Sequence, residues 1–135
     1  MEPRISLITL GVRDLNRATA FYRDILGLPQ LPSPEGVISF FELGRTWLSL
    51  FPRAELAHDA GLADEPRFDQ FPGFTLAYNV AQREQVDQIL GELAGKGVKI
   101  VKPATDADWG GRSGYFADSE GFLWEVAWNP HFPHV

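Results

Sequence analysis

The sequence predicts an α+β fold in which two paired βαβββ modules form a mixed-sheet, half-barrel cup. Three observations favour this fold. Strand-like and helical patterns are short and alternate along the 135 residues. Their order, strand–helix–strand–strand–strand, occurs twice, with Val12 aligned to Val80 and Gly44 aligned to Gly121. One module of this size cannot bury both faces of its own sheet, so we expect the two to pair within a single domain.

The first module is expected at about residues 4–51, and its helix has clear boundaries. Asp14 can cap the N-terminus of that helix, Gly27 can end it, and Pro29 prevents its continuation. Apolar residues recur at helical spacing between these limits. The expected elements are a strand over 5–12, a helix over 15–26, and a hairpin of strands over 37–43 and 46–51 that turns at Gly44-Arg45.

The second module is expected at about residues 73–130, after a stretch without a periodic pattern. That stretch, residues 52–72, predicts a linker with room for a short helix. The expected elements of the module are a strand over 73–80, a helix over 83–94, a strand over 98–101 that Pro103 stops, a loop over 104–111, and strands over 112–117 and 122–128. The second half therefore repeats the order of the first.

Composition narrows the class of protein. The chain has no cysteine, which excludes disulfides and thiolate chemistry and fits a reducing compartment. Its net charge of −6 does not suit binding to nucleic acid or to an anionic membrane, because both need clustered basic residues. No apolar run approaches the roughly 20 residues that span a bilayer, and a signal peptide is not evident. We expect a cytoplasmic protein whose partner is a small molecule.

Several motifs carry a resemblance to a known family. In the first module they are Asp14-Leu15, Phe21-Tyr22 and Leu26-Gly27-Leu28. In the second they are Trp109-Gly110-Gly111, Gly114-Tyr115-Phe116-Ala117-Asp118, Gly121 and Leu123-Trp124-Glu125-Val126-Ala127. Together they resemble the vicinal oxygen chelate superfamily, which includes glyoxalase I, the extradiol dioxygenases and the bleomycin-resistance proteins. The resemblance covers nearly the whole chain and implies the same cup-shaped fold, usually as a homodimer.

The resemblance also implies where a metal would bind. Metal-using members supply four ligands from four strands, and the matching positions here are Leu7, Leu48, Thr75 and Glu125. Leucine has no lone pair, and threonine is a poor ligand for a borderline metal. A single carboxylate does not make a structural or catalytic centre. We therefore expect no divalent metal and no other cofactor.

Glu125 is the candidate catalytic residue. By strand alternation it shares a face with Leu123 and Ala127, and the resemblance turns that face into the cup, near Leu7 and Leu48. A partly desolvated carboxylate there suits a general base or an anchor for a cationic group. The alternative is an acid left from an ancestral site and paired with Arg112 or another donor.

The candidate ligand-binding residues surround this carboxylate. Trp109 and Arg112 flank a glycine pair at the expected rim, where Trp109 could stack on a ligand and Arg112 could bind a carboxylate or phosphate. The alternative is a turn anchored by a packed tryptophan. The full set is Trp109, Arg112, Asn79, Thr75, Leu7 and Leu48.

Other conspicuous side chains are expected to be structural or exposed. Alternation places Trp47 and Trp124 on the helix side of their strands, in the core, and favours a core position for Tyr78. His131 and His134 lie in a short tail and are expected to be exposed.

Two functions remain open on the sequence. One is a small-molecule enzyme of the lyase or isomerase type, with Glu125 as its base and without the family metal. The other is a non-catalytic protein that sequesters a ligand, as the bleomycin-resistance members do. The acidic charge and the 13% aromatic content suit a cationic, planar ligand.

Overall fold

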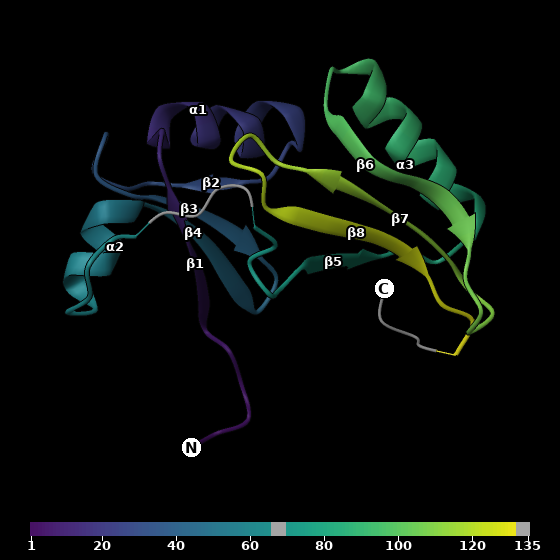
Figure 1. Ribbon diagram of the computed structural model, residues 1–135, viewed down its shortest axis with the longest axis horizontal. Coiled ribbons are helices and arrows are strands. Elements are labelled where there is room, and N and C mark those ends of the chain that lie inside the picture. The colour runs from purple at the N-terminus through teal and green to yellow at the C-terminus, as the bar shows by residue number, and fades with distance from the viewer. Residues whose placement is uncertain (66–69, 132–135) are drawn as a thin grey trace. The chain divides into compact units, whose positions relative to one another are not determined.

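The computed structural model describes residues 1–65 and 70–131. The chain divides into two compact units, with the division between residues 67 and 68. In the described residues each unit contains one four-stranded mixed sheet with a helix along one face (Figure 1). The predicted α+β class and the repeated module are confirmed. None of the helices in these ranges is long and apolar enough to cross a membrane.

The first unit begins with the strand and capped helix that the sequence predicts. Its elements are β1 (Leu7–Val12), α1 (Leu15–Ala20), the π-helical turn η1 (Phe21–Ile25), β2 (Gln30–Leu31), β3 (Ser39–Leu43), β4 (Thr46–Pro52) and α2 (Arg53–Asp59). The Asp14 carboxylate accepts a hydrogen bond from the Arg17 amide at 3.0 Å, so it caps α1 as expected. The strand order is β1-β4-β3-β2, with β1 and β4 parallel and the other pairs antiparallel.

Contacts with α1 and η1 identify the covered face of the first sheet. The rings of Tyr22 and Phe41 lie 5.8 Å apart, and the Thr19 and Ser39 hydroxyls lie 2.7 Å apart. Phe41 is directly opposite Leu48 in the β3–β4 ladder. Paired residues of an antiparallel ladder share a face, so Leu48 points toward the helix. We call the face turned away from α1 or α3 the open face of each sheet.

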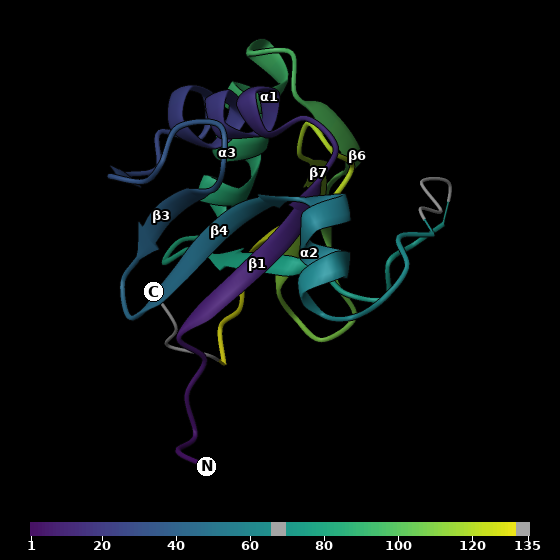
Figure 2. The ribbon, with the colours of Figure 1, turned by 90° about the vertical axis from the view of Figure 1, so that its left-hand side faces the viewer.

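The segment expected to be a linker begins with a helix that belongs to the first unit. Helix α2 packs against β1 and β4 (Figure 2). A Cβ atom added at Gly11 would meet Leu56 Cδ2 at 3.3 Å, so a larger residue there would press on α2. Gly11 alternates with Val12, which is on the α1 side, and α2 therefore covers one end of the open face.

The second unit repeats this order with a longer helix. Its elements are β5 (Leu76–Asn79), α3 (Glu84–Gly95), β6 (Lys99–Asp106), β7 (Arg112–Ala117) and β8 (Leu123–Trp128), with strand order β5-β8-β7-β6. The expectation that Pro103 ends the third strand is wrong, because β6 continues to Asp106. β6 is an edge strand, and its register against β7 shifts between Ile100 and Thr105, so it tolerates the missing proline N–H.

Helix α3 packs closely on the second sheet because β7 contains Gly114. A Cβ atom at this position would lie 2.5 Å from Leu90 Cδ1 on α3. Gly114 is opposite Val126 in the β7–β8 ladder, and the neighbouring pair Phe116 and Trp124 stacks with ring centroids 6.1 Å apart. These pairs lie on the α3 side and form the core of this unit, which confirms the buried position expected for Trp124.

Candidate functional site

The structure places Glu125 on the open face of the second sheet. Val126 faces α3, and the side chains of a strand alternate, so Glu125 points to the other side. Its neighbours across the strands are Ala77 on β5 and Tyr115 on β7. Leu123 and Ala127 flank Glu125 along β8, so apolar side chains lie beside this half-buried carboxylate on every side except that of Tyr115.

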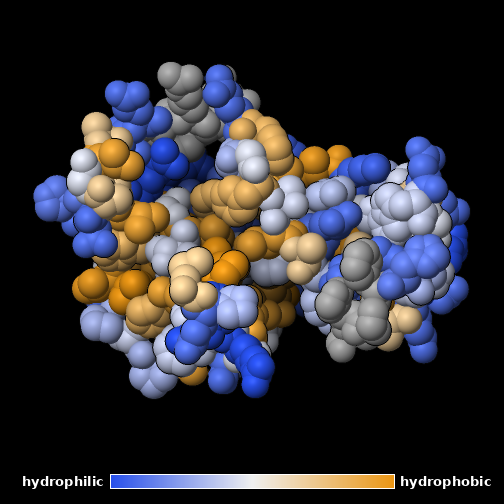
Figure 3. Space-filling model, turned by 90° about the horizontal axis from the view of Figure 1, so that it is seen from below, coloured by the Kyte–Doolittle hydropathy of each residue, from blue (hydrophilic) through white to orange (hydrophobic). Residues whose placement is uncertain are grey.

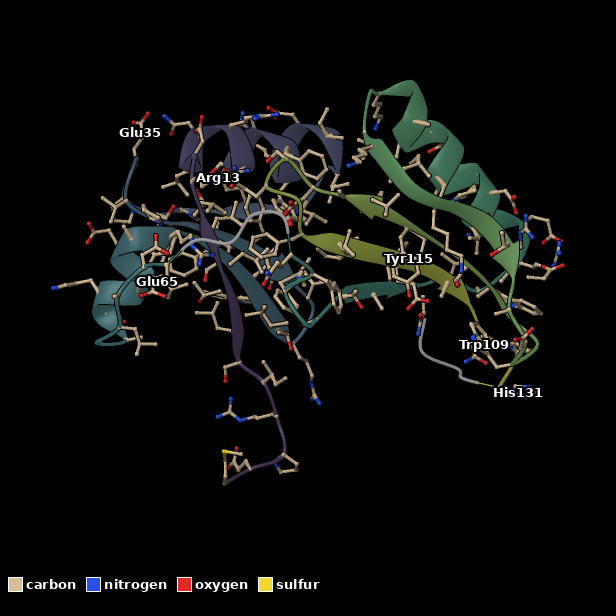
Figure 4. The ribbon with its side chains drawn as sticks, viewed as in Figure 1. Arg13, Glu35, Glu65, Trp109, Tyr115 and His131 are labelled. Atoms are coloured by element: carbon tan, nitrogen blue, oxygen red, sulfur yellow. The ribbon has the colours of Figure 1, made fainter. Side chains whose placement is uncertain are left out.

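Tyr115 is the polar partner of this carboxylate, and Figure 4 shows it on β7. Burial raises the pKa of the Tyr115 phenol, and its interaction with the neighbouring Glu125 carboxylate raises the pKa further. The two residues are directly opposite each other in the β7–β8 ladder. The sequence motif contains Tyr115, but its pairing with Glu125 depends on the register of the hairpin, which the motif alone does not specify.

Arg112 does not pair with Glu125. It lies on the α3 side of β7, where Nε and Nη2 each donate to the Asp87 carboxylate at 2.7 Å and Nη1 donates to Asp106 at 3.0 Å. These bonds hold the pKa of both carboxyl groups below the ordinary value. We expected Arg112 to bind a ligand at the rim of the cup, and this expectation is corrected. Its guanidinium instead links α3 to the β6–β7 edge, and only 16% of the side chain is exposed.

Glu125 forms no ion pair within the described part of its own unit. Within residues 70–131, no lysine, arginine or histidine comes within ion-pair distance of its carboxylate. A half-buried carboxylate has two oxygens and can accept several hydrogen bonds. The arrangement can therefore bind a proton donor or take up a proton.

Trp109 lies at one end of the second unit, with His131 near it and Tyr115 farther away (Figure 4). Its ring packs over Gly111, so closely that a Cβ atom at Gly111 would overlap the indole. The residue as a whole is 45% exposed. Trp109 thus anchors the turn before β7, and its role as a ligand contact stays a prediction. His131 is exposed, and His134 lies outside the described residues.

Asn79 is on the same side of the second sheet as Glu125. Asn79 is opposite Ala127, which alternates with Val126, and Thr75 directly precedes β5 and is exposed. Tyr78 has the opposite orientation but is 55% exposed, so the expectation of a core position for it is wrong. It lies on β5, an edge strand, where neighbouring chain covers a side chain less fully.

The assignment of Leu48 to the cup is wrong. Leu48 faces α1 and is fully buried, and its neighbour Ser49 lies on the open face. Ser49 is paired with Thr9 as Glu125 is paired with Ala77, so Ser49 is the true counterpart of Glu125. Its hydroxyl lies 2.6 Å from that of Thr9. The repeat therefore carries an acid in the second module and a hydroxyl pair in the first.

The rest of the open face of the first sheet is mostly apolar and aromatic, with the exposed Glu42 opposite Trp47 on β3. Leu7 is opposite Trp47 on this face, as expected for Leu7. The core position expected for Trp47 is wrong, because its side chain points away from α1 and is 42% exposed. Its ring centroid lies 6.1 Å from that of Phe40. Figure 3, which views the molecule from the side opposite α1, shows hydrophobic residues gathered on this side of the first unit.

The donor set does not fit the family metal. Of the four family positions, Leu48 points into the core and Leu7 has no donor atom. Thr75 offers a weakly ligating hydroxyl, so the carboxylate of Glu125 is left as the one good ligand among the four. In residues 1–65 and 70–131 no three histidine, aspartate or glutamate side chains cluster in a way that could hold a metal ion.

The chain belongs to the glyoxalase/bleomycin resistance protein/dioxygenase superfamily, whose sequence profile matches residues 4–126. It is similar to YraH of Bacillus subtilis, an uncharacterized protein, with 31% identity over 122 residues that cover 88% of this chain and 93% of YraH. It is also similar to the fosfomycin resistance protein FosX of Listeria monocytogenes, with 27% identity over 128 residues that cover 90% of this chain and 86% of FosX.

Solved structures agree with this assignment. A glyoxalase-related enzyme from Fulvimarina pelagi is 29% identical and superposes with a TM-score of 0.85, covering 97% of this chain and 91% of that one. The crystal structure of Listeria FosX superposes with a TM-score of 0.72 at 26% identity, covering 97% of each chain. The fold and the family predicted from the sequence motifs are confirmed.

Proposed function

We propose that this chain binds a small organic molecule against the open face of its second sheet, with Glu125 as the functional carboxylate. One observation supports this most strongly: Glu125 is half-buried on the open face beside Tyr115, and within residues 70–131 of its own unit it forms no ion pair. A partly buried charge without a partner lowers stability unless something else compensates it. Binding of a ligand to Glu125 is the simplest way to compensate this charge.

In the catalytic form of this proposal, the protein is an enzyme of the lyase or isomerase type. Glu125 acts as general base and takes a proton from the substrate, while Tyr115 keeps the carboxylate oriented. The reaction proceeds without a resident divalent metal, because the family positions supply one carboxylate. The expected metal content of the purified protein is therefore well below one ion per chain, and stoichiometric, tightly bound metal would refute this part.

The alternative is a protein that sequesters its ligand without turnover. The exposed Trp47 and its neighbour Phe40 favour it, because aromatic rings on an open sheet face bind planar molecules but do not transfer protons. The similarity to FosX, a fosfomycin resistance protein, makes antibiotics reasonable first ligands to test. For either function we propose a cytoplasmic homodimer, and light scattering after gel filtration tests its mass.

A thermal-shift screen of metabolites and antibiotics, including fosfomycin and bleomycin, tests the proposed site. A ligand at 100 times its Kd stabilises the folded state by about 2.7 kcal/mol, which is a shift of several degrees. The screen is run on the native protein, on Glu125→Gln and on Glu92→Gln, a matched control on the exposed surface of α3.

We expect at least one compound to stabilise the native protein and Glu92→Gln but not Glu125→Gln. NMR spectra of the same mixtures then distinguish turnover from simple binding. Equal stabilisation of all three proteins by every hit would show that the ligand site lies elsewhere.

A further inference from the structure

We infer that the open face of the first sheet binds a methylated ammonium cation, held by the rings of Phe40 and Trp47 and by the carboxylate of Glu42. We call these three residues the aromatic corner. The inference goes beyond the proposed function, because it assigns a further site in the first unit and its test does not involve Glu125.

The first step concerns position. Phe40 and Glu42 are two residues apart on the open face of β3, and Trp47 is directly opposite Glu42 on β4. The Glu42 N–H donates to the Pro29 carbonyl oxygen at 3.1 Å. The Trp47 N–H donates to the Ser6 carbonyl oxygen at 3.0 Å. The two opposite residues therefore do not bond to each other through the backbone, and pairs of this kind bring their side chains closest together.

The second step concerns the rings. The ring centroids of Phe40 and Trp47 lie 6.1 Å apart, and the ring planes are inclined by 56°. Rings inclined in this way can both attract one cation, because cation–π attraction extends to about 6 Å from a ring centroid. Trp47 is 42% exposed, so a ligand can reach its ring.

The third step concerns charge. Within residues 1–65, the described part of the first unit, no arginine or histidine lies within ion-pair distance of the Glu42 carboxylate. This holds for Arg45 too, although it lies in the turn between β3 and β4. Arg4, which precedes β1, pairs with Glu2 at 2.8 Å. Glu42 is exposed and the chain has a net charge of −6, so a cation is the ligand that complements the corner.

The fourth step concerns hydrogen bonds. Ser49 is opposite Phe40 on the same face, but it is fully buried and its hydroxyl lies 2.6 Å from that of Thr9. Of the three side chains in the corner, the carboxylate alone accepts hydrogen bonds. A primary ammonium group has three N–H donors to satisfy. A fully methylated ammonium group has none, and its methyl groups can pack on both rings.

Three small probes test these steps: choline, ethanolamine and 3,3-dimethylbutan-1-ol, which has the shape of choline without its charge. Each is titrated into the full chain, and NMR follows the indole N–H signal of Trp47, which is assigned by its loss in Trp47→Leu. Ethanolamine keeps the charge but lacks the methyl groups. We expect choline to bind at least about 5-fold more tightly than either of the other two.

Variants of the corner separate the charge from the rings. Glu42→Gln should weaken choline binding by about 3-fold or more and leave the alcohol unchanged, because only the cation loses an opposite charge. Glu35→Gln is the matched control and should preserve choline binding, since Glu35 is exposed in the loop between β2 and β3. Trp47→Leu keeps an apolar side chain without the ring, so choline should lose its advantage over the alcohol in ligand-detected NMR. Should Trp47→Leu not fold, the same ratio in the native protein and in Glu42→Gln decides.

Four results would overturn the inference. They are equal binding of choline and the alcohol, equal binding of choline and ethanolamine, no response of Trp47 to choline, and unchanged choline binding in Glu42→Gln. A Trp47 signal that shifts with protein concentration alone would show that a second copy of the chain covers this face, and would also overturn it. None of these results bears on the ligand of Glu125, which the thermal-shift screen tests with its own variants.

Discussion

Substitution of Gly114 by alanine is predicted to push α3 away from the sheet that holds the site. A Cβ atom at this position would lie 2.5 Å from Leu90 Cδ1, 2.8 Å from the Lys102 carbonyl oxygen and 3.0 Å from the Ala104 amide nitrogen. The leucine can change its rotamer, but the two backbone atoms belong to β6 and cannot move independently of that strand. The added methyl group must therefore displace either β6 or the helix.

The expected cost follows from the packing. Overpacking a close-packed interior by a methyl group costs about 1–3 kcal/mol. Gly91 provides a matched control, because it lies on the exposed side of α3 and an added Cβ meets nothing within 4 Å. Gly91→Ala should stabilise the helix by up to about 1 kcal/mol, since alanine has the higher helix propensity. The same chemical change should thus have opposite signs at the two positions.

Urea unfolding followed by tryptophan fluorescence measures the difference, which we expect to be about 1–4 kcal/mol. Unfolding of the Gly91→Ala variant also checks that alanine is tolerated in this unit. If Gly114→Ala is as stable as Gly91→Ala, the close approach of α3 to β7 is wrong, and with it the assignment of the open face opposite α3.

Three further predictions concern polar side chains in the two units. Arg112→Met should lower the stability measured by urea unfolding, because Asp87 and Asp106 lose their shared partner. It should leave the affinity of a Glu125-dependent ligand unchanged. A loss of affinity in a folded variant would show that Arg112 is part of the ligand site. Tyr115 has a raised pKa, so the stability that its neutral phenol contributes is fully present below pH 10, the ordinary value of its pKa, and is lost as the pH rises through the folded-state pKa. Glu125→Gln should make that loss smaller, as seen in unfolding curves on either side of pH 10, and an unchanged loss would argue against the pair. Ser49→Ala should cost about 1 kcal/mol of unfolding free energy, because it removes the buried hydroxyl that bonds to Thr9. An unchanged unfolding free energy would mean that this bond does not form.

The sequence predicted the modules well because their signals are local. Asp14 as a helix cap, Gly27 with a positive φ of 69° after the helix, and the alternation in β8 each act within a few residues. The same local logic failed at Pro103. A proline ends a central strand but not an edge strand, and edge position is a property of the whole sheet.

The face on which the counted residue lies could be predicted in β8 and not in β4. Leu48 was placed by counting from Gly44, as Glu125 was from Gly121. The turn after Leu43 has two residues, whereas the loop after Ala117 has five. The same number of residues counted from Gly44 and from Gly121 therefore ends on opposite faces of the two sheets. A shift of one residue turns every side chain of a strand to the other face.

A signal in β4 could have corrected this assignment. Leu48 and Leu50 form an apolar set on one face, whereas Ser49 interrupts the other, which already favours the core for Leu48. The ion pairs of Arg112 could not be predicted in the same way, because Asp87 and Asp106 approach it from α3 and β6, 25 and 6 residues away in the sequence.

Amide chemical-shift mapping with a compound found in the thermal-shift screen tests the central claim most directly, because it reports which residues respond to a bound molecule without assuming a reaction. The account predicts that the largest shifts occur at Ala77, Tyr115, Glu125 and Ala127, which surround the carboxylate on the open face of the second sheet. It also predicts that Glu125→Gln abolishes these shifts. Shifts that persist in Glu125→Gln, or that cluster on the exposed surface of α3, would contradict it.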